Sequence, residues 1–306
     1  MKMEKRVYGI LGISSIMSNW NADFSGEPKS ISNGRIFGSD KAFKYPMKKM
    51  WENQGEKVLY IKSLKVDKGV LIPKTLKERY EQLFPEKKLD KNTETIDVIK
   101  NLFKAIDVKN FGATFAEEGN NISITGAVQI GQGFNFYDES NTEVQDILSA
   151  FKNSKDDDAK ASTLGKKIVS DEAHYFYPFN INPLAYKEFI ELEITDGYTE
   201  EDYLKFKEAA LSSATSFATN SKVGCDNEFG LFIETEEDFY LPILTQYIKF
   251  EKGEEKNKIT LNLSTILKGV ENHIKNIEIY YNPVTTEIVT DISNYKLINI
   301  LTKKEV

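Results

Sequence analysis

The sequence has very few of the residues that build disulfide frameworks or zinc sites. Cys225 is its only cysteine, and His174 and His273 are its only histidines. One cysteine cannot close a disulfide within a chain, and a structural zinc site needs four ligands of these kinds. We therefore expect no disulfide, no metal site and no cofactor.

Long apolar runs are missing as well. No window approaches the roughly 18 to 20 apolar residues that a membrane-spanning helix needs. The polar start Met1–Arg6 is followed by an apolar stretch that is too short for a signal peptide. These absences predict a cytoplasmic protein without a membrane partner.

Motifs that carry enzymatic chemistry are not found in the sequence. Gly9 and Gly12 lack the flanking residues of a P-loop or a dinucleotide fingerprint, and no nucleophile elbow occurs. His174 stands alone among aromatic residues of a predicted strand, which is typical of a structural histidine. The sequence predicts a protein that is not an enzyme.

Charge is divided unevenly along a chain whose formal net charge is −7. Residues 1–110 carry 22 Lys and Arg against 14 Asp and Glu, a net charge of +8, and residues 111–306 carry the remaining −15. This asymmetry suits a protein that holds a polyanion on one side, or copies that pack basic side to acidic side. Chance patterning of a solvated surface is the alternative.

The stretch from Val7 to Trp51 combines a strand, a polar loop and a basic helix. Residues 7–16 are rich in β-branched and aromatic residues, which predicts a buried strand. A loop rich in Ser, Asn, Gly and Pro follows to Ser39, and Ser39 and Asp40 can cap a helix. Spacings of three and four place Lys41, Lys44 and Lys48 on one face of that helix. The combination predicts a site for backbone phosphates.

The rest of the chain predicts an α+β fold within a single domain, 1–306. The elements we expect are a strand over 57–64, helices over 73–84 and 93–106, a hairpin of 108–115 with 121–130, a polar projecting arm over 138–165, a strand over 168–179, a helix over 199–217 and a strand over 228–234. Strand, helix, hairpin, helix and strand, with two helices on one face, fit a ferredoxin-like or RNA-recognition-motif plan best.

A short segment, Gly131-Gln132-Gly133-Phe134, follows the predicted hairpin directly. Two glycines around Gln132 permit another backbone to come close, and Phe134 offers an aromatic face beside Gln129 and Gln132. Such faces can stack with nucleic-acid bases, although packing in the core is the more common role for a phenylalanine.

Five short motifs in order resemble those of one family. The motifs are Asn19-Trp20-Asn21-Ala22-Asp23-Phe24-Ser25-Gly26-Glu27-Pro28, Ser39-Asp40-Lys41-Ala42-Phe43-Lys44, Phe111-Gly112-Ala113, Thr125-Gly126-Ala127-Val128-Gln129 and Thr219-Asn220-Ser221-Lys222-Val223-Gly224. With these motifs the chain resembles the backbone subunit of CRISPR type I effector complexes (Cascade), the "Cas seven" family of the RAMP superfamily, in its type I-B form. The sequence departs from the family's usual glycine and proline at Ala22 and Ala127 and from its usual arginine at Asn220.

The resemblance implies a non-catalytic subunit that binds guide RNA (crRNA) in several copies, joins other Cascade subunits and helps to bind complementary target DNA. It also implies an RNA-recognition palm with a helical finger-like insertion, which we place at 55–107, and an extended thumb-like arm, which we place at 132–167. Because base pairing reads the sequence, the protein should hold phosphates and sugars and stack bases.

The resemblance and the residue types together identify candidate RNA contacts. Lys41, Lys44 and Lys48 are assigned to phosphates, Asn21 and Gln129 to sugar or phosphate oxygens, and Phe134 to a base. The full set of candidates is Asn19, Asn21, Lys41, Lys44, Lys48, Gln129, Gln132, Phe134, Lys166, Lys167, Ser221 and Lys222.

Two other functions remain open on the sequence alone. Related backbone subunits of type III complexes cut RNA with a loop aspartate and a divalent ion, and Asp23 lies in a similar loop. An Asx turn in a Gly- and Pro-rich segment is the simpler role for Asp23. The other alternative is an RNA-binding module outside CRISPR systems.

Overall fold

The strand predicted near the N-terminus forms the centre of a nine-stranded sheet. The computed structural model describes residues 1–86, 88–148 and 163–306. The strand order is β16-β14-β11-β1-β10-β8-β2, and β7 and β9 also pair with β10. The strands are β1 (Arg6–Ser18), β2 (Phe37–Gly38), β7 (Val128–Ile130), β8 (Gly133–Asn135), β9 (Thr142–Leu148), β10 (Thr163–Ile181), β11 (Cys225–Thr235), β14 (Ile274–Tyr281) and β16 (Lys296–Asn299).

Three long antiparallel strands make the middle of this sheet. In β1, Val7 pairs with Ile181 of β10 on one side and with Glu234 of β11 on the other. Val7, Ile10, Leu11 and Ile13 are fully buried because layers cover both faces of β1. The expectation of a buried strand is confirmed, and so is a mixed α+β fold.

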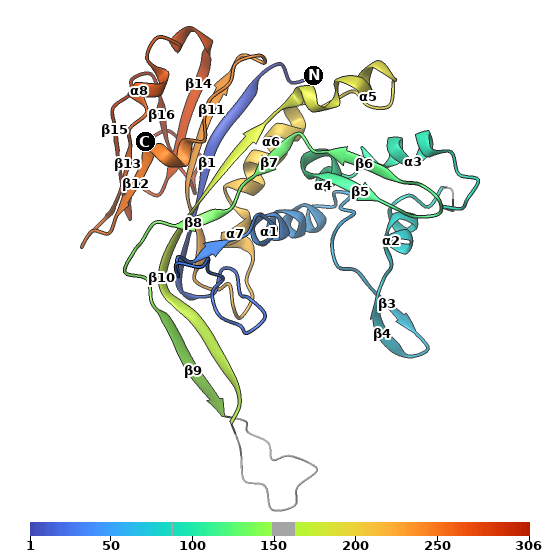
Figure 1. Ribbon diagram of the computed structural model, residues 1–306, viewed down its shortest axis with the longest axis horizontal. Helices are drawn as coiled ribbons and strands as arrows, with labels where there is room; N and C mark the ends of the chain where they lie inside the picture. The colour runs from blue at the N-terminus through green and yellow to red at the C-terminus, as the bar shows by residue number, and fades with distance from the viewer. Residues whose placement is uncertain (87, 149–162) are drawn as a thin grey trace, which may run out of the picture.

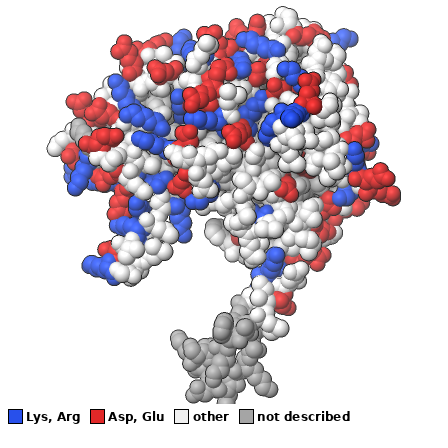
Figure 2. Space-filling model, turned by 180° about the vertical axis from the view of Figure 1, so that it is seen from behind, with Lys and Arg blue, Asp and Glu red and all other residues white. Residues whose placement is uncertain are grey.

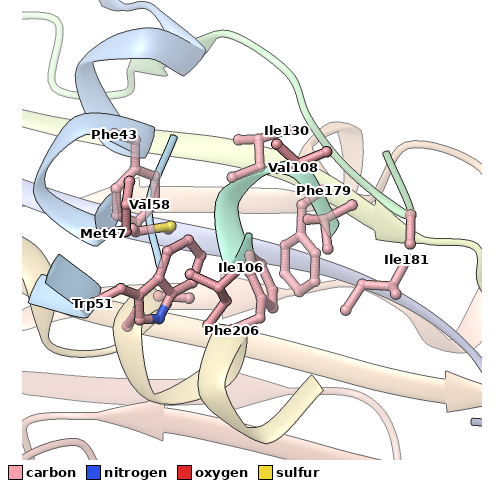
Figure 3. Packing of buried hydrophobic residues seen from close by; sticks show 14 of the residues in the cluster. Phe43, Met47, Trp51, Val58, Ile106, Val108, Ile130, Phe179, Ile181 and Phe206 are labelled. Carbon is pink, nitrogen blue, oxygen red and sulfur yellow. The ribbon is translucent and has the colours of Figure 1, made fainter. Parts of the chain in front are cut away.

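Helices cover one face of the sheet. Ser39 caps α1 (Asp40–Asn53) by accepting a hydrogen bond from the Ala42 amide, and Thr199 begins α6 (Glu200–Ala210) with a full capping box. Both helix starts confirm the sequence expectation, although the second helix ends earlier and is followed by the short α7 (Ser213–Ser216). Figure 3 shows Phe43, Met47 and Trp51 from α1, with Phe206 from α6, packed beside Phe179 of β10.

A second, smaller sheet covers the opposite face. It has the order β12-β13-β15, and it encloses a separate apolar cluster with Ile10, Leu231 and Ile279 of the central sheet. The sequence has strand propensity at 241–250 and 259–263, but its pattern did not predict this extra layer. Its elements are β12 (Ile248–Glu251), β13 (Asn257–Leu261), α8 (Ser264–Leu267) and β15 (Thr286–Thr290), with 3-10 turns at Leu244–Tyr247 and Glu271–His273. A further 3-10 turn, Pro183–Tyr186, follows β10 and packs in the apolar cluster on the helix side.

A lateral lobe lies beside the sheet (Figure 1). It holds two hairpins and short helices, and the finger boundaries 55–107 stay a prediction. Its elements are β3 (Leu64–Asp67), β4 (Val70–Pro73), α2 (Leu76–Leu83), α3 (Thr95–Leu102), α4 (Ile106–Phe111), β5 (Gly112–Phe115) and β6 (Ile122–Thr125); α5 (Lys187–Glu191) lies nearer the N-terminus.

Two strand predictions in this lobe are wrong. Residues 57–63 form no strand, because the Leu59 and Tyr60 amides donate to the buried carboxylate of Asp107 instead of to another strand. Residues 106–111 are helical, and the hairpin starts only at Gly112, whose φ of +81° favours glycine. The stretch predicted as its second strand is divided, because β6 pairs with β5 whereas β7 joins β10.

An arm projects from the lower end of the sheet, where β9 pairs with the first half of β10 (Figure 1). The predicted polar arm, 138–165, includes β9 and only the start of β10, and its residues 149–162 lie outside the described part of the chain. The thumb boundaries 132–167 also stay a prediction. No helix among the described residues is long and apolar enough to cross a membrane.

Candidate nucleic-acid interface

The loop between β1 and α1 is held against the core by buried aromatic residues. Trp20 is fully buried, and its indole donates to the Tyr177 hydroxyl at 2.5 Å. A Cβ at Gly38 would meet Tyr177 and Trp20 within 2.6 Å, and one at Gly133 would meet the Tyr177 ring at 2.3 Å. Glycine at these two positions lets β2 and β8 pass over the Trp20–Tyr177 pair.

Two asparagines of this loop act as internal braces. Asn19 is buried and donates to the backbone oxygens of Gly26 and Ile168, at 3.0 and 3.2 Å. Asn21 accepts a hydrogen bond from the Ser39 amide at 2.8 Å. Both were candidate RNA contacts, and in the structure their amides fix the loop and the start of α1.

Lys222 joins the segment 219–224 to the same loop. Its ammonium group donates to the backbone oxygens of Asn19, at 2.6 Å, and of Trp20. Burial lowers the pKa of Lys222. Ser221 next to it has an exposed side chain, while its backbone oxygen accepts from the Asn19 amide. The geometry makes Lys222 a brace and leaves Ser221 at the surface.

The three lysines of α1 have different surroundings. Lys41 is exposed. Lys44 pairs with Asp40 at 2.9 Å, one helical turn before it. Lys48 lies 3.5 Å from the buried Asp107 carboxylate and donates to the Tyr60 backbone oxygen at 3.2 Å. Of the three, Lys41 is therefore the one that presents its charge to solvent.

The pKa of Lys48 is lowered, as is typical of a lysine that is enclosed by the protein. Burial lowers its pKa, and the Asp107 carboxylate opposes that effect only in part. A phosphate would have to compete with Asp107 for an ammonium group that is mostly enclosed. Lys48 therefore fits a structural role better than a phosphate contact.

Substitution of Lys48 tests this role. Lys48→Met should lower the free energy of unfolding by about 3 kcal/mol, because Asp107 then keeps a buried charge without its cation. Lys44→Met should cost only about 0.5 kcal/mol, as for other helix-surface pairs. Urea unfolding measures both. A Lys48→Met protein as stable as the wild type, with much weaker RNA binding, would contradict the structural role.

An aromatic and cationic cluster lies at the edge of the sheet. Phe134 of β8 lies beside Phe37 of β2, with ring centroids 6.0 Å apart. The Arg35 guanidinium lies 5.1 Å from the Phe134 ring centroid and 5.0 Å from that of Phe136, and its Nε donates to the Asn135 backbone oxygen. Phe134 is half-buried, so one part of its ring remains accessible.

Arg35 and Lys29 belong to this surface, and sequence reasoning missed both. Lys29 is half-buried and its amide donates to the Asn21 backbone oxygen, whereas Arg35 is exposed. Both residues lie in the same polar loop as Asn21, and this position could have identified them as candidate RNA contacts from the sequence. Lys29, Arg35 and Lys41 are cations of the surface around the start of α1.

Hydrogen bonds and strand pairing bring the loop, the start of α1, β8 and the segment 219–224 together. We call this set the loop surface. Gln132 is exposed beside β8. Gln129 is exposed on β7 and pairs with Asn180 of β10, whereas Phe134 pairs with Phe176 of the same strand. Asn180 and Phe176 are four residues apart, which corresponds to roughly 13 Å along a strand. The loop surface therefore continues along β10 toward Gln129.

Two candidate lysines lie on the arm, away from the loop surface. Lys166 pairs with Asp146 and Lys167 with Gln145 in the β9–β10 ladder, and Lys166 is exposed. Both lie about ten residues along β10 from Phe176, the partner of Phe134, roughly 30 Å at strand spacing. They can contribute to the same surface only if the ligand is extended or touches more than one copy.

Asp23 lies at the tip of the loop and is already engaged. One of its carboxylate oxygens, Oδ1, accepts hydrogen bonds from the amide and hydroxyl of Ser25 and from the Glu27 amide, at 2.7 to 3.0 Å. The Ser25 hydroxyl in particular lowers the pKa of Asp23. Among the described residues no three His, Cys, Asp or Glu side chains gather as a metal site would require.

Comparison with known proteins gives one family match. The family model described as CRISPR-associated protein Cas7 matches residues 5–266. A chain of a solved "CRISPR RNA-guided surveillance complex, pre-nicking" is similar in structure, with a TM-score of 0.58, 14% identity and 97% of each chain covered. A chain of a "CRISPR RNA-guided surveillance complex" has a TM-score of 0.44 at 14% identity, over 89% of this chain and 88% of that one, too weak to define a shared fold. No protein of curated function matches.

Proposed function

Since the chain belongs to the CRISPR-associated protein Cas7 family, we propose that it is a guide-RNA-binding backbone subunit of a type I-B Cascade complex. Several copies bind one crRNA side by side, together with other Cascade subunits, and the assembled copies help to hold complementary target DNA. The subunit has no catalytic role of its own.

The loop surface is the observation that carries this proposal. It combines cations with an accessible aromatic ring and the exposed side-chain amide of Gln132, which suit phosphates, riboses and base faces. The side-chain amides of the buried Asn19 and the half-buried Asn21 are used to fix the loop. Such a surface holds an RNA strand whatever its sequence, as a guide-binding protein must.

Strand order supports a ferredoxin-like palm of the RNA-recognition type. The central strands have the order β11-β1-β10-β8, with antiparallel neighbours. One helix, α1, lies in the connection from β1 to β8, and α6 lies in the connection from β10 to β11. We assign the lateral lobe to the finger and the β9–β10 arm to the thumb, where Lys166 and Lys167 reach RNA or a neighbouring copy.

Salt dependence of RNA binding tests the proposal. The purified protein should bind single-stranded RNA of unrelated sequences with similar affinity, and log K should fall linearly with log salt because phosphate contacts release counterions. Fluorescence anisotropy with labelled RNAs of equal length measures both properties. Affinity that does not change with salt, or that depends strongly on sequence, would contradict it.

The identity of the RNA separates a Cascade subunit from a general RNA-binding module. RNA that copurifies with the protein from its native host should contain CRISPR repeat-derived sequence. Sequencing this RNA is the measurement. A random sample of cellular RNA would favour a role outside CRISPR systems.

Replacement of Asp23 tests the nuclease alternative. Asp23→Ala should leave guide-complementary RNA equally intact in the presence of magnesium, because Asp23 Oδ1 closes a turn. Gel analysis of labelled RNA compares the variant with the wild type. Magnesium-dependent cleavage by the wild type that disappears in Asp23→Ala would establish an enzyme of the type III kind.

A further inference from the structure

The β3–β4 hairpin of the lateral lobe has an uncovered apolar face. Its two strands pair only with each other, through a two-residue turn at Lys68 and Gly69, which both have positive φ. Register places Leu64 opposite Pro73 and Val66 opposite Leu71 on one face. All four side chains on that face are exposed, Val66 by 72% and Leu71 by 63%.

This face has the character of an interaction surface. An isolated two-stranded hairpin is marginally stable in water, and contiguous exposed apolar groups mark contact sites. Lys68 at the turn and Lys62 before β3 are exposed and form no side-chain hydrogen bond or ion pair with any described residue. A partner should therefore offer apolar groups together with carboxylates.

A cavity at the other end of the molecule offers this combination. It has a volume of about 460 Å³ and lies beside the β12–β13 turn, with the exposed apolar residues Ile16 and Leu301 in its wall. Asp226, Glu254 and Glu255 also line it, and their carboxylates have no hydrogen bond or ion pair within the described chain. We call it the acidic pocket.

The figures place the two surfaces apart. In Figure 1 the β3–β4 hairpin lies at the lower right and the β12–β13 turn at the far left. In the reverse view of Figure 2 the hairpin projects at the lower left with basic side chains, and acidic side chains gather at the right-hand tip. A contact between them cannot form within one chain.

The other described cavities suit the hairpin less well. The largest of them, of about 1120 Å³, is lined by five lysines and four carboxylates, and the carboxylates of Glu56 and Asp202 are already paired with lysines of the same cavity. Its lysines outnumber its carboxylates, so it attracts Lys62 and Lys68 less than an acidic wall does. The cavity beside β7, lined by Tyr8 and Leu241 among others, has no carboxylate in its wall. A cavity of about 520 Å³ beside α8 has two carboxylates, but both already accept hydrogen bonds from neighbouring residues and two lysines share its wall. Charge complementarity therefore selects the acidic pocket.

We infer that the β3–β4 hairpin of one copy docks in the acidic pocket of the next copy along the RNA. This inference rests on the proposed function, in which copies bind one RNA side by side. Because hairpin and pocket are different surfaces, the contact is head-to-tail and can be repeated along an open array. The apolar face meets Ile16 and Leu301, while Lys62 and Lys68 approach the free carboxylates.

Cysteine pairs test the contact directly, because the natural Cys225 is buried. Val66→Cys combined with Leu301→Cys should give a ladder of cross-linked multimers under oxidising conditions when a long RNA is bound. Val66→Cys combined with Leu204→Cys, equally exposed on α6, is the matched control and should stay monomeric. Equal cross-linking of the two pairs would overturn the inference.

Charge exchange provides a second test and separates the inference from the proposed function. Lys62→Glu with Lys68→Glu should reduce the loading of several copies on a long RNA about tenfold, and so should Glu254→Lys with Glu255→Lys. Combining all four changes should restore loading. Binding to an RNA short enough for one copy should stay unchanged throughout.

The outcomes of this exchange differ in meaning. Failure of the four changes to restore loading would overturn the docking contact, even with single-copy binding intact. Loss of single-copy binding by the hairpin changes would show that the hairpin contacts RNA instead. Absence of RNA binding by the wild type would contradict the proposed function itself.

Discussion

Replacing Lys29, Arg35 and Lys41 together with alanine should lower the affinity for single-stranded RNA about 100-fold near 0.1 M salt. Each removes a cation from the loop surface, and losing three phosphate contacts on a single strand should flatten the slope of log K against log salt by about 2. Anisotropy titrations at several salt concentrations measure both quantities. The loss should be the same for RNAs of different sequence.

A variant that replaces three lysines outside the loop surface provides the control. Lys249, Lys268 and Lys296 are exposed on or beside β12, α8 and β16, and their triple replacement changes the net charge by the same amount. That variant should lose little affinity. If both triple variants lost affinity equally, long-range net charge and not the loop surface would explain binding.

His174→Gln should lower the free energy of unfolding about as much as Lys48→Met, and the loss should depend on pH. The buried imidazole lies between the carboxylates of Glu228, at 2.8 Å, and Glu172, at 3.0 Å, and stacks on Phe250. Lys252 pairs with Glu172 from the β12 side. Removing the imidazole leaves two partly buried carboxylates facing its place, at a cost of about 3 kcal/mol.

The pH dependence of this loss has a definite sign. Burial alone would lower the pKa of His174, but Glu228 and Glu172 outweigh burial and raise it. A raised pKa gives stability that is fully present below the unfolded value of about 6.5 and is lost as pH rises through the folded pKa. Hydrogen bonds from Lys252 and His174 oppose burial and lower the pKa of Glu172, so its contribution is lost in acid, below about pH 4.3.

Urea unfolding of wild type and His174→Gln between about pH 5 and pH 9 measures this window. The difference in free energy of unfolding should be largest near pH 6 and shrink toward pH 9. His273→Gln is the control, because His273 pairs with Glu236 while 38% of its side chain is exposed. A difference that does not change with pH would contradict a charged imidazole.

The sequence predicted those elements whose local signals agree with their tertiary surroundings. Residues 7–16 are apolar and form β1, and the caps at Ser39 and Thr199 mark the true starts of α1 and α6. Residues 57–64 have strand propensity as well, but Asp107, far along the chain, takes their amide hydrogens. A long-range polar contact of this kind leaves no local pattern.

The candidate site shows the same limit. The residue types and the segments that form the loop surface could be chosen from the sequence, since 19–39, 131–134 and 219–224 are joined in the structure. Which side chains point outward could not be chosen. Lys41 and Lys48 share a helix, yet only the position of Asp107 decides that Lys48 turns inward. Arg35 was missed because its stacking on Phe134 depends on the pairing of β2 with β8.

The Trp20–Tyr177 pair beneath Gly38 and Gly133 has a thermodynamic consequence for association. Because these rings and the Asn19, Asn21 and Lys222 braces already hold the polar loop in one conformation, little chain entropy is left to lose when a ligand arrives. Ordering of the loop should therefore contribute little to the heat-capacity change of binding. The association rate should be set by diffusion and charge, and not by slow folding of the loop.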